Sequence, residues 1–472
     1  MRFDEPCLFT IFNVYVGFLN ADLPRANGFD LASLQYQARL KFFEQEIFKP
    51  CLAICGNDLH VINHEFMLPQ SYCEKPRSNL EFLGYDYTMF DLHKHFMLDP
   101  SIIFLNHGSF GATPKPVFRE YQRWQAELEK QPVEFLARRI TGLMANARIA
   151  LAAYIGTHAD NLVYTQNATI SLNIIARSLD LKAQDEVLTT IHEYGAMDRM
   201  WRFLAKELEF HYINRATSTP IPSKEKFIEE FWSGVTPKTR VIFISHIASS
   251  TAIILPVEEI VARAREAGII TIVDGAHVPG QISLDLDSLG PDFYAGNLHK
   301  WLCAPKGAGF LYARPEVQKL LKPLVVSCGY ESETPSGSMF VDHYEWWGTR
   351  DMSAFLSVPA AIQFQESHNW KRVREACHQL AKEYQKRLCE LTGLHPLHPA
   401  QGNWFRQMFS VPLPRDVDIT SLKSHLYDEF RIEVPILEWN GNNLIRVSVQ
   451  GYNTQDDLDA LFHALSNLLK VA

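Results

Sequence analysis

The chain has 472 residues, of which 47% are hydrophobic and 21% are charged, and its formal net charge is −9. This composition is ordinary for a globular protein, and the length leaves room for two or three domains. A nucleic-acid-binding protein needs a surplus of lysine and arginine to neutralise phosphates, so the acidic balance argues against one. Small-molecule chemistry is therefore the favoured class of function.

No apolar run approaches the roughly 20 residues that a membrane-spanning helix requires. The nearest candidate, residues 8–19, is too short, and it follows Asp4 and Glu5 instead of a basic segment, which argues against a signal peptide. Eight cysteines in a chain of this length do not indicate a disulfide scaffold. We therefore expect a cytoplasmic protein that has no membrane contact.

Residues 1–90 show no clear hydrophobic period, and we expect a weakly ordered extension that lies outside the main fold. This stretch contains four potential zinc ligands, Cys51, Cys55, His60 and His64. The cysteine pair and the histidine pair are separated by four residues, whereas a zinc finger needs about a dozen to wrap strands and a helix around the ion. We expect no metal site here.

From Ile102 onward, short β-rich runs alternate with amphipathic helical stretches, a pattern typical of a parallel sheet covered by helices. The predicted strands are residues 162–165, 186–190, 240–245, 269–273, 292–294 and 308–312. The predicted helices between them are residues 171–179, 196–207 and 256–267, the last of which Gly268 follows as a C-terminal cap.

The pattern changes after about Glu345. It continues with a long helical stretch, then strand-like pieces, then a closing helix: residues 357–391, 407–411, 444–449 and 455–469. We interpret residues 345–472 as a small α+β domain and residues 91–344 as a large domain. Residues 91–115 are expected to contribute to the small domain or to the mouth of a substrate site.

Polar residues follow two neighbouring predicted strands. Asp274 comes directly after one strand, and Lys300 lies a few residues after the next. Ligands of open α/β sheets bind at the carboxyl ends of the strands. A lysine that forms a Schiff base and a carboxylate that keeps a pyridinium nitrogen protonated are what pyridoxal-phosphate (PLP) chemistry requires. Each residue alone would indicate only a helix cap or a surface charge, but the two in this order are more specific.

Two further sequence features bear on a PLP site. Residues 163–169 leave a strand and enter a helix, and the free N–H groups of a helix start can bind a phosphate. A plain N-terminal cap by Asn167 or Thr169 is the alternative interpretation. Lys306, in a glycine-rich turn, is a rival for the Schiff-base lysine, but we expect it on the surface or on the phosphate side.

Six motifs occur in the order seen in class V aminotransferases, and the chain most resembles the isopenicillin N epimerase-like branch of that family. These motifs are residues 105–111 (LNHGSFG), 192–196 (HEYGA), 274–277 (DGAH), 297–301 (NLHKW), 348–350 (GTR) and 446–448 (RVS). The resemblance runs from about Asp91 to the C-terminus. It implies the PLP-dependent transferase fold type I, an α/β fold whose large domain has a mixed, mostly parallel seven-stranded sheet, with a small α+β C-terminal domain. It also implies a homodimer with shared active sites.

The resemblance implies roles for the residues around the cofactor ring. Lys300 resembles the Schiff-base lysine, and Asp274 resembles the partner of the ring nitrogen. Tyr194 matches the residue that stacks on the ring, and His277 stands near the ring hydroxyl. Ser249 stands where cysteine desulfurases have an asparagine.

Other residues resemble the family's phosphate and substrate contacts. Those for the phosphate are Ala168, Thr169, Asn297 and His299, with Thr349 reaching in from the neighbouring subunit. Arg446 resembles the arginine that grips the carboxylate of the amino-acid substrate, a task that suits its forked guanidinium. Asn106 and His107 match a loop at the mouth of the substrate site.

The fold alone does not identify the reaction. The last two cysteines, Cys377 and Cys389, fall in a helical stretch, and no cysteine lies near Arg446 in the sequence, which disfavours a persulfide-forming desulfurase. Our leading hypothesis is an epimerase-like reaction on an amino acid through an external aldimine, with Lys300 and Tyr194 as catalytic groups. The alternatives are a C–S lyase similar to the fungal hercynylcysteine sulfoxide lyases, an aminotransferase, and a PLP-fold protein that binds without turnover.

Overall fold

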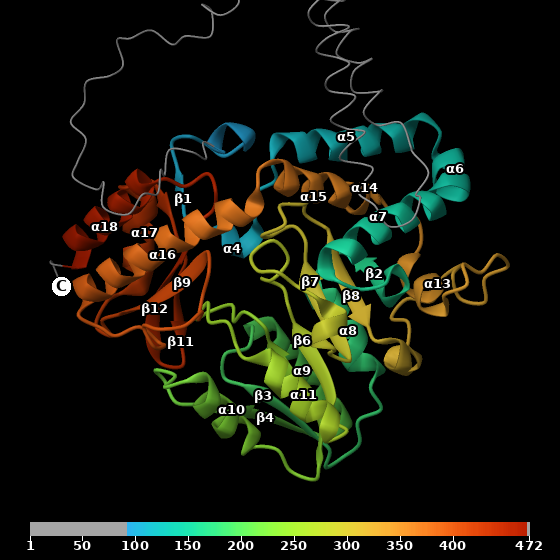
Figure 1. Cartoon of the computed structure of the whole chain (residues 1–472), viewed down its shortest axis with the longest axis horizontal. Coiled ribbons are helices and arrows are strands. Elements are labelled where there is room, and N and C mark those ends of the chain that lie inside the picture. The colour runs from blue at the N-terminus through green and yellow to red at the C-terminus, as the bar shows by residue number, and fades with distance from the viewer. Residues whose placement is uncertain (1–91, 470–472) are drawn as a thin grey trace, which may run out of the picture. The chain divides into compact units, whose positions relative to one another are not determined.

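The central element of the fold is a seven-stranded sheet with the strand order β2-β8-β7-β6-β5-β3-β4. The computed structural model describes residues 92–469, so the expected N-terminal extension with Cys51, Cys55, His60 and His64 lies outside the described residues (Figure 1). The strands are β2 (Leu162–Thr165), β3 (Glu186–Thr190), β4 (His211–Arg215), β5 (Thr239–Ser245), β6 (Ile270–Asp274), β7 (Phe293–Asn297) and β8 (Gly309–Ala313). Strand β8 is antiparallel to both β2 and β7, whereas the other pairs are parallel. The predicted mixed, mostly parallel sheet is confirmed.

Both faces of this sheet are buried, and the sequence of β5 shows why. Val241 and Phe243 pack into one hydrophobic core, whereas Ile242 and Ile244 pack into another, because successive side chains of a strand point to opposite faces. The first core contains α8 (Ala168–Ser178), α9 (Gly195–Leu208) and α13 (Met339–Glu345). The second contains α7 (Ile140–Ile155), α10 (Lys224–Trp232) and α11 (Val257–Glu266).

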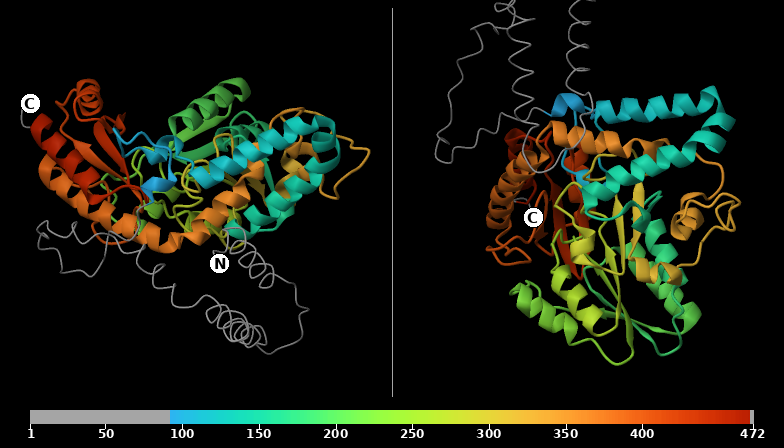
Figure 2. Two further views of the ribbon diagram at one scale, coloured as in Figure 1. Left: turned by 90° about the horizontal axis from the view of Figure 1, so that it is seen from above. Right: turned by 45° about the vertical axis from the view of Figure 1, so that its right-hand side comes forward.

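A smaller antiparallel sheet follows in the C-terminal part of the chain, with the order β11-β12-β9. Its strands are β9 (Met408–Leu413), β11 (Ile436–Trp439) and β12 (Asn442–Ser448), and its helices are α16 (Trp370–Thr392), α17 (Ile419–Asp428) and α18 (Gln455–Leu468). The short strand β1 (Ile103–Phe104) pairs in parallel with β10 (Ile432–Glu433). The first described residues are thereby joined to the C-terminal part (Figure 2). The domain boundary near residue 345 stays a prediction.

The remaining helices connect these parts. Helix α5 (Lys115–Lys130) packs with α15 (Val358–Ser367) and α14 (Ser353–Leu356), and α15 also packs on α7 (Figure 1). The other helical segments are short: η5 (His93–His95), α4 (His107–Phe110), α6 (Pro132–Glu134), η6 (Phe135–Arg139), η7 (Ala159–Asn161), α12 (Leu286–Leu289) and η8 (Pro315–Leu320).

Most predicted elements are present, with bounds that match or differ by at most three residues, but one expectation was wrong and one strand of the large sheet was missed. The stretch 357–391 is not one helix, because Asn369 has φ of 48°, a left-handed conformation that interrupts a right-handed helix between α15 and α16. Strand β4 was not predicted. Its residues are half-buried or exposed at the sheet edge, so they lack the continuous apolar run of the central strands.

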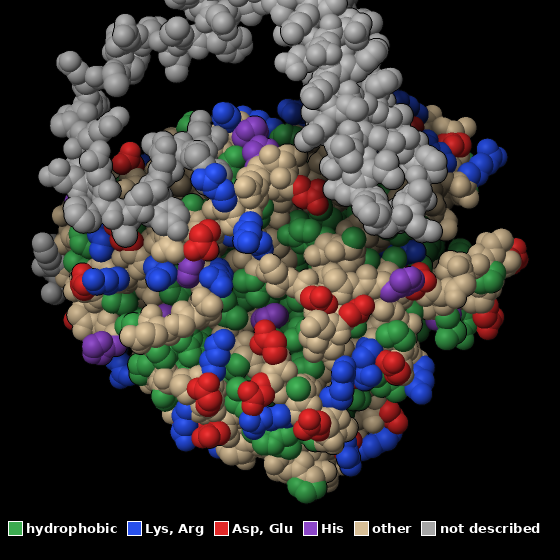
Figure 3. Space-filling model, viewed as in Figure 1, with side chains coloured by type: hydrophobic (Ala, Val, Ile, Leu, Met, Phe, Trp, Pro, Cys, Tyr) green, Lys and Arg blue, Asp and Glu red, His purple; other side chains and the backbone are tan. Residues whose placement is uncertain are grey.

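Within residues 92–469, no helix is long and apolar enough to cross a membrane, and no group of His, Cys, Asp or Glu side chains could hold a metal ion. On the face that Figure 3 shows, basic and acidic side chains are interspersed.

A buried ion pair between α7 and α13 yields the first prediction. Arg148 and Glu345 form a salt bridge with side chains that are only 7% and 13% exposed. Glu345→Ala would leave Arg148 as a buried, unpaired charge, so we expect the free energy of unfolding to fall by about 3–5 kcal/mol. Urea denaturation followed by circular dichroism measures this change.

The matched control is Glu390→Ala, whose partner Lys386 is 3.8 Å away and 79% exposed. Because exposed ion pairs contribute little, the unfolding midpoint should hardly move. Equal effects of the two substitutions would contradict the importance of the buried pair.

Candidate active site

A pocket of about 250 Å³ lies at the carboxyl ends of the central strands, next to the starts of α8 and α9. Loops that follow parallel strands meet at this edge, where ligands of open α/β sheets bind. Nine of the predicted site residues line the pocket: Ala168, Thr169, Tyr194, Ser249, Asp274, His277, Asn297, His299 and Lys300. The sequence therefore located the pocket from several separate motifs.

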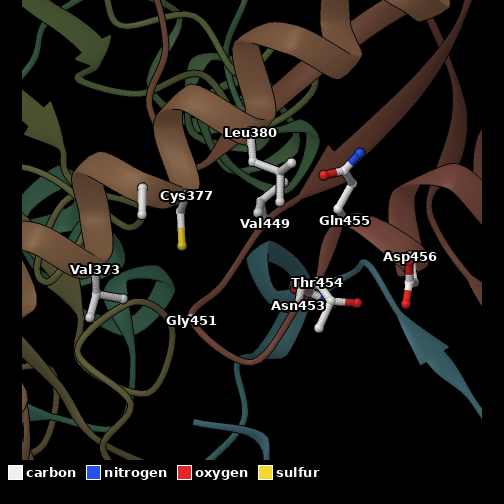
Figure 4. Close-up of a pocket in the computed structure, with 10 residues that line it drawn as sticks. Val373, Cys377, Leu380, Val449, Gly451, Asn453, Thr454, Gln455 and Asp456 are labelled. Carbon is white, nitrogen blue, oxygen red and sulfur yellow. The ribbon is translucent and has the colours of Figure 1, made fainter. Parts of the chain in front are cut away.

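A second cavity of about 330 Å³ lies between α16 and the start of α18 (Figure 4). Its lining includes Cys377, Leu380 and Val449, but no lysine, arginine or histidine. Burial raises the pKa of the Cys377 thiol to about 12, which leaves it uncharged and a poor nucleophile at neutral pH. Acid–base and amine chemistry are therefore concentrated in the first pocket.

Asp274 is the last residue of β6 and is 5% exposed. Its Oδ1 accepts a hydrogen bond from the backbone N–H of Ala276 at 2.9 Å. A side chain at Gly275 would place its Cβ about 2.0 Å from the ring of Tyr294, so only glycine lets the chain turn here. Burial raises the pKa of Asp274, and the hydrogen bond from the N–H of Ala276 opposes that shift. The carboxylate therefore lacks a full counter-charge and is suited to a cationic ring nitrogen.

His277 connects Lys300 to the buried indole of Trp301. The Trp301 indole N–H donates to Nδ1 of His277 at 3.3 Å, so Nδ1 carries no proton. Burial is the main cause that lowers the pKa of His277 well below its usual value, so the ring is neutral and its proton must sit on Nε2. Nε2 lies 3.1 Å from Nζ of Lys300. The lysine amine must therefore accept this hydrogen bond, which requires its uncharged form.

The electrostatics of the pocket favour the same state of Lys300. Burial is the main cause that lowers its pKa to about 7, and the positive charge of Arg446 adds to the shift. An uncharged amine is a nucleophile toward a carbonyl group, whereas an ammonium is not. The rival Lys306 does not line the pocket, and its Nζ donates to the backbone carbonyl of Gly111 at 3.1 Å.

The start of α8 provides open hydrogen-bond donors. Asn167 caps the helix by accepting from the N–H of Ile170 at 3.0 Å, and the N–H of Ala168 donates to Oδ1 of Asn297 at 2.8 Å. Thr169 is exposed to the pocket, and its hydroxyl and N–H bind no other described residue. A phosphate at the positive end of this helix would find these two donors free.

Arg446 on β12 is not among the residues that line the pocket, but its guanidinium contacts Ser249 and Ser109, which do line it. One guanidinium nitrogen donates to the backbone carbonyl of Ser249 at 2.7 Å, and the other donates to Oγ of Ser109 at 2.9 Å. Its Nε–H has no partner, and no carboxylate pairs with it among the described residues. Burial is the main cause that lowers the pKa of Arg446 to about 10, so it remains charged at neutral pH. A buried cation with free N–H groups is suited to an incoming carboxylate.

Two predicted residues, His107 and Asn106, lie elsewhere than the sequence implied, whereas Thr349 was expected at the site of a neighbouring subunit. His107 does not line the pocket mouth: it is fully buried, with its ring nitrogens 3.0 Å from the Lys300 carbonyl and 2.9 Å from the Tyr452 hydroxyl. Asn106 also lies outside the pocket and donates to Glu433. Thr349 is exposed and does not line the pocket of its own chain.

The sequence analysis missed three polar residues of the site. Ser109 and Ser245 line the pocket. Glu193 is 5% exposed and accepts from Thr190 at 2.6 Å and from Ser245 at 2.7 Å. Burial raises the pKa of Glu193 to about 8, so its carboxyl is mostly protonated at pH 7. Its place beside Tyr194 in the HEYGA motif was the one available signal.

The donor set of this pocket fits PLP. Lys300 offers an uncharged amine for the aldehyde, and Asp274 offers a carboxylate for the ring nitrogen. The open donors of Thr169 suit the phosphate, and Tyr194, which is 47% exposed at the pocket, offers an aromatic face for the ring. One group of the chain thus matches each chemical part of the cofactor.

Comparisons with known proteins agree with this assignment. The family model described as Aminotransferase class-V matches residues 111–461. The isopenicillin N epimerase of Amycolatopsis lactamdurans is 37% identical over 385 residues, which cover 79% of this chain and 96% of that protein. The hercynylcysteine sulfoxide lyase of Schizosaccharomyces pombe is 24% identical over 80% of this chain and 96% of its own length.

A solved structure shares the fold. The cysteine desulfurase of Thermococcus onnurineus superposes with a TM-score of 0.70 at 21% identity, covering 81% of this chain and 98% of that chain. This likeness supports the predicted fold type and does not by itself carry an activity.

The lowered pKa of Lys300 gives a prediction about reactivity. The uncharged fraction of this amine should rise through pH 7, so its rate of reductive alkylation by a small aldehyde should level off above about pH 8. Acetyl-lysine amide, with an ordinary pKa of about 10.4, should still be gaining reactivity there. Mass spectrometry of the cofactor-free protein after borohydride trapping measures the rate at Lys300.

The control for this prediction is Arg446→Met. Removing a nearby positive charge should shift the midpoint of the Lys300 profile to higher pH. A midpoint near the ordinary lysine value in the unsubstituted protein would show that the amine is not buried as described.

Proposed function

Since the chain is a PLP enzyme of the aminotransferase class-V family, we propose that it epimerises an amino acid at the α-carbon. The observation that carries this proposal is the similarity to isopenicillin N epimerases along four-fifths of the chain, 79% in the case of the Amycolatopsis protein. The pocket chemistry supports it, because groups that could handle a proton enter the pocket from two different loops. PLP, when bound, supplies an electron sink for the bond that breaks at the α-carbon.

Four polar groups in or beside the pocket each have a proposed task. Lys300 would hold the cofactor covalently, and its uncharged amine would remove the α-proton of the substrate. Asp274 holds a proton on the ring nitrogen, and Arg446 binds the α-carboxylate of the substrate. His277 donates to the lysine amine at 3.1 Å and thereby directs its lone pair.

Tyr194 is the proposed second acid. It caps the start of α9, lines the pocket and leaves its phenol accessible, with 47% of the residue exposed. A group that returns the proton from the face opposite Lys300 inverts the α-carbon, whereas return by Lys300 alone restores the starting configuration. We therefore propose that Tyr194 decides between epimerisation and simple proton exchange.

A C–S lyase is the second candidate. The similarity to a hercynylcysteine sulfoxide lyase favours it, and no cysteine is among the residues that line the pocket. A reaction that releases the sulfur fragment directly needs no protein thiol to accept it. An aminotransferase and a non-catalytic PLP-binding protein are further outcomes that the same experiment separates.

The reaction is tested by incubating the holoenzyme in deuterated water with isopenicillin N, common L-amino acids and S-substituted cysteines. We expect deuterium at the α-carbon with racemisation, detected by NMR and chiral chromatography. Tyr194→Phe should slow racemisation about 100-fold, since positioned acids contribute this much, while α-proton exchange by Lys300 continues.

The controls separate the alternatives. Lys300→Ala should abolish both exchange and racemisation, whereas Lys306→Ala should keep them. Release of pyruvate would indicate the lyase, pyridoxamine phosphate would indicate a transaminase, and an unchanged substrate panel would indicate a binding protein. Full racemisation by the Tyr194→Phe variant would rule out the phenol as the second acid.

We also propose that the enzyme is a cytoplasmic homodimer in which Thr349 completes the partner's site. Thr349 is exposed and lies outside the pocket of its own chain. The nearby segment before and at the start of α13 exposes apolar side chains that a partner would cover: Leu324, Val325, Val326, Tyr330 and Met339. An interface at this segment would bury these side chains and bring the hydroxyl of Thr349 to a phosphate.

This arrangement predicts complementation between two inactive subunits. In a mixed dimer of Lys300→Ala and Thr349→Ala subunits, one site combines an intact Lys300 with an intact Thr349, and the other has neither. We expect that mixing equal amounts of the variants restores high-affinity PLP binding at one of the two sites of each mixed dimer, which is about a quarter of all sites, measured by absorbance titration. If Thr349 acted within its own subunit, mixing would restore nothing.

A further inference from the structure

The guanidinium of Arg446 is held in place from two directions. The backbone carbonyl of Ser249 accepts from one terminal nitrogen, and Oγ of Ser109 accepts from the other at 2.9 Å. A carboxylate is recognised in a forked geometry only when the guanidinium plane is fixed. Of these two partners, only Ser109 acts solely through its side chain, so it is the partner that a substitution can remove.

Ser109 begins a chain of hydrogen bonds whose direction is determined by chemistry. Arg446 can only donate, so Oγ of Ser109 accepts from it. The Ser109 hydroxyl then donates to Oδ1 of Asn106 at 2.5 Å, and Nδ2 of Asn106 donates to Oε1 of Glu433 at 2.8 Å. Every donor in this chain points from the cation toward the anion, so each bond polarises the next.

The far end of this chain is anchored by backbone structure. Glu433 belongs to β10, which pairs with β1, and its carbonyl accepts from the N–H of Leu105 at 3.0 Å. The backbone N–H of Gly108, the residue before Ser109, donates to Oγ of Ser448. Ser448 lies two residues after Arg446 on β12. The segment that carries Asn106 and Ser109 is therefore fixed to β10, which carries Glu433, and to β12, which carries Arg446.

We propose that Glu433, Asn106 and Ser109 are positioning residues that orient Arg446 for the carboxylate of the substrate. The inference rests on the proposed role of Arg446 in substrate binding. Asn106 and Glu433 are connected to Arg446 through the hydroxyl of Ser109, so both act through Ser109 and Arg446. We call the hydrogen bonds from Arg446 through Ser109 and Asn106 to Glu433 the relay. Loss of this relay weakens binding of the substrate carboxylate and leaves cofactor binding intact.

The test compares two amines that differ only in a carboxylate. Glycine and methylamine both displace Lys300 from the cofactor of the holoenzyme and shift its absorption band, but only glycine can use Arg446. For Ser109→Ala we expect the dissociation constant of glycine to rise about tenfold, the usual cost of one charge-assisted hydrogen bond. The dissociation constants of methylamine and of PLP should stay unchanged.

Matched variants separate positioning from general damage. Ser109→Thr keeps the hydroxyl and should retain glycine affinity within about twofold. Asn106→Ala and Glu433→Ala should each weaken glycine binding less than Ser109→Ala does, because they break the chain farther from Arg446. Ser101→Ala, which removes an exposed hydroxyl bonded only to Asp99, should have no effect.

Three results would overturn the inference. If Ser109→Ala weakens the binding of glycine and of methylamine equally, the serine shapes the pocket and does not orient Arg446. If Ser109→Ala leaves glycine binding unchanged while Arg446→Lys weakens it, the relay is wrong and the proposed role of Arg446 stands. If Arg446→Lys does not change the affinity for glycine, Arg446 does not bind the substrate carboxylate, and the proposed relay is also wrong. An absence of racemisation in the reaction test is a separate readout and leaves these comparisons valid.

Discussion

The burial of the Lys300 amine against His277 is the constraint on which the pocket depends. An ammonium group in this largely buried position loses much of its hydration, and the positive charge of Arg446 adds to the penalty, so the pKa falls to about 7. The indole of Trp301 reinforces this state, because it fixes the histidine proton on the nitrogen that faces the lysine. A nucleophilic amine at neutral pH is thus a consequence of packing and of one defined tautomer.

The sheet creates the conditions for that burial. Strands β5, β6 and β7 are almost entirely buried, and their carboxyl ends bring Ser245, Asp274 and Asn297 to one edge. Asp274 lies opposite Ser245 in the strand register. Because helices cover both faces of the sheet, these strands meet the cavity at their polar edge. The position of the pocket therefore follows from the same apolar pattern that makes the sheet.

The sequence predicted the parts of the site that lie at strand ends and helix starts, and missed those that depend on tertiary contacts. Asp274, Lys300 and Thr169 each follow a recognisable local element. The local pattern around Asn106 and His107 indicated a loop at the site, but it did not indicate that their side chains point to Glu433, Tyr452 and the Lys300 carbonyl. Those partners are more than 190 residues away along the chain. Glu193 was missed for the same reason, since a buried carboxyl is recognised by its surroundings and not by its neighbours in sequence.

The pocket retains polar groups that the fold itself does not satisfy. Nε of Arg446 is buried without a partner, and the donors of Thr169 bind no described residue. Most buried polar groups in native proteins are paired, so an unpaired buried group beside a pocket indicates a place where a ligand can complete the hydrogen bond. A cofactor phosphate at Thr169 and a substrate carboxylate at Arg446 would each supply a missing partner. Since these ligands bind the folded chain and not the unfolded one, the groups that weaken the empty pocket are also those through which binding stabilises the enzyme.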